Sequence, residues 1–292
     1  MAINYASKFL PEIEQQYARA LTSAGLDRNK KYSFLDAKTI NVPSVQLSGY
    51  KDHARNGSKN RGVVNNTYQP MAMAHDRDIE FFVDDADVIQ TNMVLTAANV
   101  TSTFNEEKAI PELDAYRYSK LFADFVTAGG VVKTTVLTAA NILGEFDIMM
   151  EDMDEAGVPE EGRILYITPK QYTLLKKAEG IQRTLEATGQ ADVNRKVRSL
   201  DDVEIQKVPS ARMKSAYDFT DGFVPAVAAR QINMILVHPT SVIAPVLYAD
   251  IYLWNKGETP DSAFGFLYQN RSFVDLFLLT AKKAGVAINA AV

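Results

Sequence analysis

The sequence predicts an α+β fold, in which helical and strand-rich segments follow one another along the chain. Three features point to it: a long amphipathic stretch near 103–128, alternating helix and short strand over 131–180, and a strand-rich end over 264–288. A length of 292 residues corresponds to about two domains of ordinary size. The chain has no cysteine, so its stability must come from packing and hydrogen bonding rather than from disulfides.

Residues 1–25 are predicted to form a helical arm. Apolar side chains recur there at helical spacing, among them Phe9, Ile13 and Tyr17, and Gly25 is the expected C-terminal stop. An apolar stripe on a terminal helix needs a partner surface. Two alternatives stay open: the arm packs on its own domain, or it docks onto a neighbouring subunit.

Residues 32–83 are predicted to contain a long β-hairpin. Strand-like residues from Ile40 to Leu47 precede a polar stretch, and a second strand-like segment follows at Val63-Val64. Asn56-Gly57, between them, is a strong turn signal because both residues tolerate positive φ. A two-stranded hairpin is only marginally stable in isolation, so we expect it to lie on another surface.

The hairpin tip and the residues after the hairpin carry opposite charges. The candidate contact residues are Lys51, Arg55, Lys59 and Arg61 at the basic tip and Asp78, Glu80, Asp84 and Asp85 in the acidic run, besides Phe9, Ile13 and Tyr17 of the arm. One alternative is that both charged runs are solvated faces, which is the commoner role of such runs. The other is that the basic tip of one subunit meets the acidic run of its neighbour, where opposed charges set register and speed encounter.

The long amphipathic stretch is predicted to be helical over 88–128. Thr103 with Glu106 fits a capping box. Pro111 predicts that a fresh helix starts there, since proline is tolerated in a first helical turn. Gly129-Gly130 is the expected end of this helix.

The remaining elements alternate between helix and strand. Thr138 is expected to cap a helix that ends at Gly157, and Thr168-Pro169 to begin another that runs to about Gly180. The polar residues 181–200 are interpreted as an exposed connection. The predicted strands are 163–168, 203–208, 232–237, 264–268, 273–280 and 287–288.

The chain shows no recognisable catalytic, cofactor or metal motif. Gly57 to Gly62 has the glycine spacing of a phosphate-binding loop, but Val63-Val64 stand where that loop needs Lys and then Ser or Thr. Asp152 to Gly157 begins like a calcium loop, but Arg163 occupies the position of its bidentate Glu. The three histidines lack the spacing of zinc ligands. We therefore nominate no catalytic residue, cofactor or metal and expect no enzyme.

Charge and hydropathy exclude further classes of protein. A formal net charge of −5 argues against a surface that grips nucleic acid throughout. The N-terminus lacks the apolar core of a signal peptide. Apolar runs such as Ile232 to Val237 are too short to span a bilayer, so no membrane partner is expected.

The order of arm, hairpin, long helix, α/β segment and closing strands resembles the major capsid proteins of tailed bacteriophages, which have the Hong Kong 97-type fold. Local sequence is also similar to that family at 110–121, 163–178, 232–245 and 268–284. The resemblance implies four parts: an N-terminal arm (1–35), an extended loop (36–78), a peripheral domain with a spine helix (79–135 and 258–292), and an axial domain (136–257).

The resemblance implies a shell protein that is made in the host cytoplasm and resides in the virion. Hexamers and pentamers of the chain would form an icosahedral capsid around double-stranded DNA, which touches the lumenal face non-specifically. Expected partners are a portal, a scaffolding protein separate from this chain if one exists, and possible decoration proteins, with non-covalent assembly. The alternatives are an encapsulin-type nanocompartment, a monomeric α/β hydrolase, and a DNA-binding module that uses Lys51 to Arg61.

Overall fold

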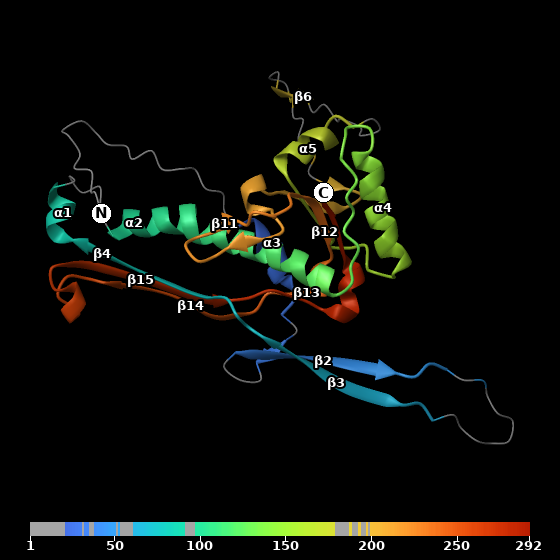
Figure 1. Cartoon of the computed structure of the whole chain (residues 1–292), viewed down its shortest axis with the longest axis horizontal. Helices are drawn as coiled ribbons and strands as arrows, with labels where there is room; N and C mark the ends of the chain where they lie inside the picture. The colour runs from blue at the N-terminus through green and yellow to red at the C-terminus, as the bar shows by residue number, and fades with distance from the viewer. Residues whose placement is uncertain are drawn as a thin grey trace.

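The computed structural model describes residues 21–30, 32–34, 38–50, 52, 61–90, 97–178, 187–188, 192–193, 197 and 199–292. Helices and strands are mixed as predicted, in three parts: a layered body, a long three-stranded sheet beside it, and a projecting hairpin (Figure 1). No helix in these ranges is long and apolar enough to cross a membrane.

A five-stranded sheet forms the centre of the body, in the order β17, β12, β5, β9, β8. β5 and β9 run parallel, and the other neighbours are antiparallel. Every residue of β5, β12 and β17 is buried, so these strands are nearly continuous apolar runs rather than alternating ones. Four of these five strands, all except β8, were predicted from the sequence and are thereby confirmed. The strands are β5 (Ile164–Ile167), β8 (Ser199–Leu200), β9 (Val203–Lys207), β12 (Ile232–Val237) and β17 (Val286–Ala290).

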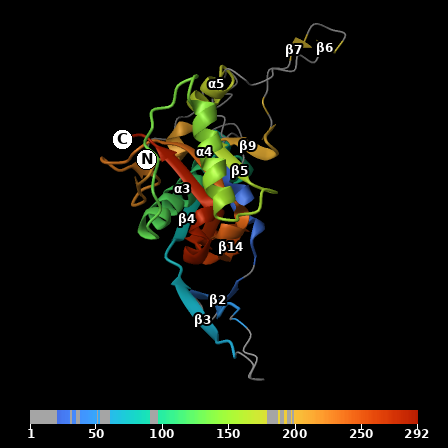
Figure 2. The same ribbon diagram turned by 90° about the vertical axis from the view of Figure 1, so that its right-hand side faces the viewer.

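Helices cover both faces of this sheet (Figure 2). Side chains of β12 alternate between the two layers, with Ile235 facing Tyr118 and Leu121 on one side and Met234 joining Phe146 on the other. The first layer holds η1 (Thr22–Arg28, a 3₁₀ helix) and α3 (Ile110–Thr127), and the second holds α4 (Ile142–Glu155) and α5 (Pro169–Leu175).

Helix ends differ from the prediction at three places. Asn141, not Thr138, precedes α4, and its Oδ1 accepts a hydrogen bond from the Thr138 N–H at 2.7 Å. α5 ends at Leu175 rather than near Gly180, because i to i−3 hydrogen bonds tighten its last turn. η1 passes through Gly25, which was the expected stop of the arm helix.

The long helix is continuous through Pro111. α2 (Ala97–Phe104), a π-helical turn η2 (Asn105–Ala109) and α3 follow one another without a break. The α-helix α3 begins at Ile110 with Pro111 in its first turn, as predicted, but the π turn joins it to α2, so the helical backbone is not interrupted there. The π turn changes the hydrogen-bond ladder just where proline has no N–H to donate. The predicted capping box is wrong, because Thr103 lies inside α2.

A second, longer sheet has the order β14, β15, β4, all antiparallel. Its strands are β4 (Asp76–Asp84), β14 (Val246–Trp254) and β15 (Gly265–Val274). The two strands predicted at 264–268 and 273–280 are instead β15 and the short β16 (Phe277–Leu278). Backbone pairing on both sides of β15 carries it through its polar middle. β4 was not predicted as a strand, because its alternating acids resemble a solvated charge run.

The predicted hairpin is confirmed as β2 (Thr39–Leu47) and β3 (Val64–Ala72), which pair over nine residues each. It extends away from the body in both views (Figures 1 and 2). The expected turn at Asn56-Gly57 lies outside the described residues. The short elements are α1 (Asp85–Gln90), β1 (Ser33–Phe34), β6 (Ala187–Thr188), β7 (Asp192–Val193), β10 (Tyr217–Asp218), β11 (Val224–Pro225), β13 (Val242–Ile243), η3 (Ser210–Arg212), η4 (Pro239–Ser241), η5 (Pro260–Ser262) and η6 (Thr280–Gly285).

Candidate assembly surfaces

The distal part of the hairpin exposes apolar side chains. Leu47 is 71% exposed, and Val63 and Val64 are 61% and 69% exposed. Only the short β1 pairs beside β2, and no strand of the described residues pairs with the other edge of β3. Apolar side chains on a projecting element are typical of a contact with another protein surface.

The root of the hairpin is packed instead. Its buried side chains Ile40, Met71 and Met73 join a cluster with Ile243, Phe273, Phe277 and Leu279 from the body. Burial of such side chains contributes roughly 1.5–3 kcal/mol each, so the root belongs to the folded body while the distal part does not.

Of the basic candidates, Arg61 is exposed at the distal end of the hairpin. Lys51, Arg55 and Lys59 lie outside the described residues, and so does any contact they make. The proposed pairing of the basic tip with a neighbour's acidic run therefore stays a prediction.

The acidic candidates lie on β4 and at the start of α1. Asp78, Glu80 and Asp84 share one face of β4 because strand side chains alternate. Glu80 accepts a hydrogen bond from Gln269 Nε2 at 2.7 Å. Asp85 forms an ion pair with Lys256 at 2.6 Å, so part of its charge is matched within its own chain.

The acidic face of β4 borders an open hollow of about 460 Å³. It holds acceptors, donors and a guanidinium together, which suits a mixed polar contact rather than a site for one anion or cation. The lining residues are Asp78, Ile79, Glu80, Tyr252, Gln269, Asn270 and Arg271.

The arm candidates Phe9, Ile13 and Tyr17 lie outside the described residues, but the segment that follows them is firmly held. Asp114 of α3 is fully buried and accepts hydrogen bonds from the backbone N–H groups of Thr22 and Ser23 at 3.1 and 2.9 Å. Arg212 of η3 forms an ion pair with the same carboxylate at 3.1 Å. One carboxylate thus joins η1, the long helix and the region after β9.

A second ion pair, with a buried arginine and a partly exposed aspartate, reinforces this anchor. Arg117, only 2% exposed, binds Asp27 of η1 through both terminal nitrogens, at 2.9 and 3.2 Å. The sequence offered one signal for these residues. Asp114 and Arg117 lie within the helical stripe that contains Tyr118 and Leu121, where a charge needs a buried partner.

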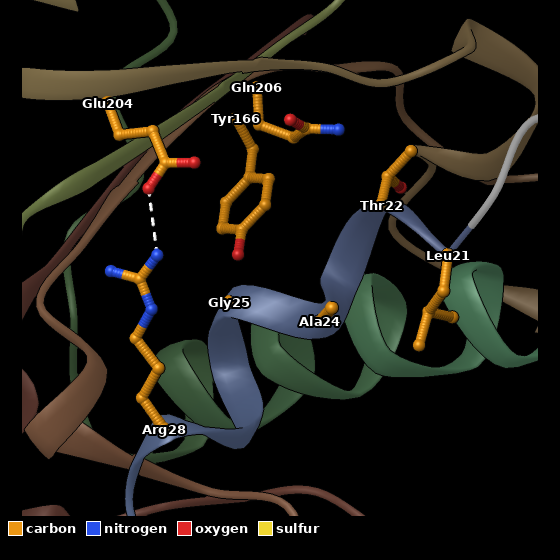
Figure 3. A pocket seen from close by; sticks show the side chains of 8 residues that line it. All are labelled: Leu21, Thr22, Ala24, Gly25, Arg28, Tyr166, Glu204 and Gln206. Carbon is orange, nitrogen blue, oxygen red and sulfur yellow. Dashed lines mark hydrogen bonds and ion pairs between the residues drawn. The ribbon is translucent and has the colours of Figure 1, made fainter.

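Next to η1 lies a small open pocket of about 240 Å³ (Figure 3). An exposed ion pair between Arg28 and Glu204, at 2.8 Å, closes one side. The Tyr166 hydroxyl points toward Gly25 and has no hydrogen-bond partner among the described residues, and burial raises the pKa of Tyr166. A Cβ on Gly25 would lie 2.7 Å from that hydroxyl, so glycine permits the close approach of η1.

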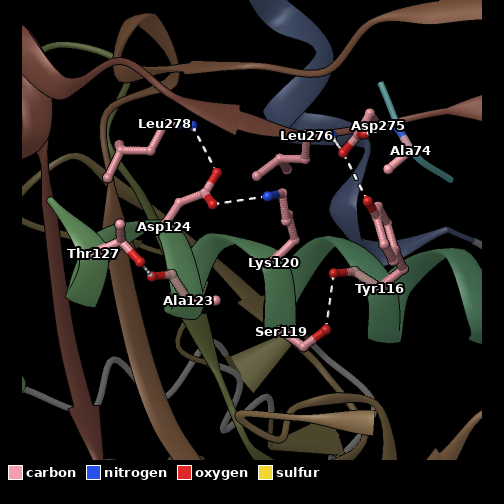
Figure 4. A network of polar contacts seen from close by, with 10 residues as sticks. All are labelled: Ala74, Tyr116, Ser119, Lys120, Ala123, Asp124, Thr127, Asp275, Leu276 and Leu278. Atoms are coloured by element: carbon pink, nitrogen blue, oxygen red, sulfur yellow. Dashed lines mark hydrogen bonds and ion pairs between the residues drawn. The ribbon is translucent and has the colours of Figure 1, made fainter. Parts of the chain in front are cut away.

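Polar contacts tie α3 to the segment after β15 (Figure 4). The Tyr116 hydroxyl donates to Asp275 Oδ1 at 2.7 Å, and the Leu278 N–H donates to Asp124 Oδ2 at 3.3 Å. Lys120 forms an ion pair with Asp124 at 2.9 Å. Burial, followed by the charge of Asp275, raises the pKa of Tyr116, so its hydroxyl keeps the proton that it donates.

The described residues hold no group of three or more His, Asp or Glu side chains that could bind a metal ion. His75 and His238 lie in different parts of the body, each with its own partners.

No protein-family model and no curated protein matches the chain. Solved structures match over nearly its whole length. The capsid structure of cyanophage P-SCSP1u aligns with a TM-score of 0.69 and 14% identity, covering 99% of this chain and 93% of that one. The mature capsid of bacteriophage PhiM1 aligns at 0.64 and 12%, covering 100% and 90%. A structure from Mycobacterium phage Che8 aligns at 0.62 and 14%, covering 99% and 98%.

The chain has the fold of these phage capsid structures. The predicted resemblance is thereby confirmed at the level of the fold.

Proposed function

We propose that the chain is the major capsid protein of a tailed bacteriophage. Copies of it assemble into hexamers and pentamers of an icosahedral shell, which encloses double-stranded DNA. The observation that carries this proposal is the agreement in fold with the cyanophage capsid over 99% of this chain and 93% of that one. A projecting hairpin with exposed apolar residues supports it, since such an element gains burial only from another surface.

The four parts expected from the sequence form part of this proposal. Residues 1–35 are the arm, 36–78 the extended loop, 79–135 with 258–292 the peripheral domain, and 136–257 the axial domain. The pairing of β4 with β15 supports a peripheral domain built from two distant segments. β14 pairs with β15 across the proposed boundary, so the long sheet links the two domains.

The partners and location follow from the same proposal. The protein resides in the virion after synthesis in the host cytoplasm, and its role is structural rather than catalytic. Its further partners are a portal, scaffolding or decoration proteins, and DNA held by non-specific lumenal contact. The structures named above come from phages, which favours a DNA-filled shell over an encapsulin-type compartment with protein cargo.

Purification of the chain followed by light scattering and electron microscopy tests the proposal. We expect closed particles or ring-shaped capsomers, with nuclease-protected DNA in particles recovered from infected cells. A chain that stays monomeric even when co-expressed with the neighbouring genes of its genome would contradict the proposal. Particles filled with a folded enzyme would support the encapsulin alternative instead.

A further inference from the structure

The chain leaves the hairpin through residues 73–75 and enters β4 at Asp76. At this exit, the Ala74 N–H donates to Asp275 Oδ2 at 2.8 Å, while Asp275 Oδ1 accepts from the Tyr116 hydroxyl and the Leu276 N–H, both at 2.7 Å (Figure 4). Asp275 is 1% exposed. One buried carboxylate thus links the hairpin exit to the long helix.

An aromatic stack holds the next residue. The His75 ring lies on the Tyr116 ring with centroids 3.7 Å apart and planes 16° apart. Phe219 meets both rings edge-on at 5.6 Å. The His75 carbonyl accepts from the Val274 N–H at 3.1 Å. Side chain and backbone at the exit are therefore fastened to α3 and to the end of β15.

The two strands of the hairpin are in turn tied to each other at the root. The Met73 N–H donates to the Lys38 carbonyl at 2.8 Å, directly before the exit. Since β2 and β3 pair over their whole length, the two strands should change direction together, as one rigid unit. The direction in which this unit projects from the body depends on the contacts that residues 73–75 make with the body.

We propose that Asp275 is the positioning residue that fixes the direction in which the hairpin projects, acting through Ala74 on one side and Tyr116 on the other. Both oxygens of the carboxylate accept, and hydrogen bonds to a charged acceptor are roughly twice as strong as neutral ones. An asparagine at 275 has only one acceptor oxygen and turns an NH₂ group toward a donor, so one of the two links is lost.

Only the consequence of this inference for contact between subunits rests on the proposed function. In a shell built from identical subunits, a hairpin already held in one direction is preorganised for contact with its neighbour. Less conformational entropy is then lost when each contact forms. The direction of the hairpin is itself a property of the single chain and is measurable without assembly.

Asp124 supplies a matched control. It is also an aspartate that ties α3 to the segment after β15, but its partners are Leu278 and Lys120 rather than a residue of the hairpin exit. Asp124→Asn thus removes the same charge near the same two elements.

The absence of cysteine makes a distance measurement direct. Leu47→Cys on the hairpin and Val136→Cys on the body place spin labels at sites that are 71% and 74% exposed. Pulsed electron paramagnetic resonance on the doubly labelled chain, diluted with unlabelled chain, then measures the distribution of distances between the two labels. We expect one narrow distribution for the parent and for Asp124→Asn, and a broadened or shifted one for Asp275→Asn.

A distribution for Asp275→Asn as narrow as that of the parent, and centred at the same distance, would overturn the inference. Should Asp275→Asn fail to fold, Tyr116→Phe decides, because it removes one hydrogen bond and keeps the ring stack. A broadened distance distribution in Tyr116→Phe supports the inference, and a distribution as narrow as that of the parent overturns it. A parent chain that stays monomeric even when co-expressed with the neighbouring genes would instead count against the proposed function, so the two failures are distinguishable.

Discussion

Asp114 is a buried carboxylate that accepts hydrogen bonds from Thr22, Ser23 and Arg212. Asp114 lies within the apolar stripe of α3, where an amphipathic pattern would place an apolar residue. The conflict is resolved by donors that lie more than 90 residues away along the chain. Buried charges of this kind specify one arrangement, because each wrong arrangement leaves a charge or a donor unpaired.

Replacing Asp114 with Ala should lower the free energy of unfolding by about 3–5 kcal/mol, because the buried N–H groups of Thr22 and Ser23 lose their acceptor and Arg212 loses this ion pair. Arg28→Ala is the control, since its ion pair with Glu204 is about half exposed and should contribute less than about 1 kcal/mol. Urea unfolding of the unassembled subunit measures both. Equal costs in the two variants would contradict the anchoring role of Asp114.

His75 should make the subunit less stable in acid. Burial, followed by the charge of Arg77, lowers the pKa of His75 from 6.5 to about 4, against opposing effects of Asp275 and Asp76. Between those values the unfolded chain binds a proton that the folded chain does not. Stability from this group is therefore complete above pH 6.5 and is lost as the pH falls toward 4, by at most about 3 kcal/mol.

His75→Phe keeps an aromatic ring against Tyr116 and cannot titrate. Unfolding free energies of the two proteins, measured from pH 7.5 to pH 4, should therefore converge or cross as the pH falls. Carboxylates that do not interact with residue 75 contribute equally to both curves, so their effects cancel in the difference. A constant difference across this range would show that His75 is not the titrating group.

At the scale of elements, tight contacts decide where the helices sit. η1 lies against β5 because Gly25 has no Cβ, and Ile164 Cδ1 and the Tyr166 hydroxyl would lie 2.6 and 2.7 Å from one. In α4, by contrast, a Cβ on Gly144 would meet nothing within 4 Å. The two glycines therefore have opposite roles, one in packing and the other only in chain flexibility.

Gly25→Ala should destabilise the subunit by about 1–3 kcal/mol, since neighbouring side chains must shift. Gly144→Ala should stabilise it by roughly 0.5–1 kcal/mol, because alanine loses less backbone entropy in a helix. Thermal unfolding of both variants measures the difference in sign. A stabilising Gly25→Ala would show that η1 can move away from β5 at little cost.

The elements that a short stretch of sequence specifies were predicted correctly. β5 and β12 were predicted from their apolar runs, and the hairpin from two strand-like segments around a polar turn. β4 was missed because the partner that makes it a strand, β15, is almost 200 residues away. The continuity of the long helix was missed because a π turn leaves no sequence signature that pattern analysis detects.

For the whole molecule, the proposed contact between hairpin tip and acidic run predicts a kinetic effect. Arg61→Glu should slow assembly several-fold in low salt, and the difference should shrink as salt screens the charges. Arg230→Glu, at another exposed arginine, is the matched control for the change in net charge. Light scattering during assembly gives the rates. Equal slowing by both variants would assign the effect to net charge alone.

The sequence alone determined the fold class, the buried strands of the body, the hairpin and the absence of recognisable catalytic motifs. These follow from hydrophobic periodicity and turn chemistry, which act over a few residues. The tertiary structure decided which distant groups meet: β4 with β15, Asp114 with Arg212, and Ala74 with Asp275. Such pairs depend on chain closure over long separations, where no local pattern records the partner, so only the folded chain shows how the hairpin is held.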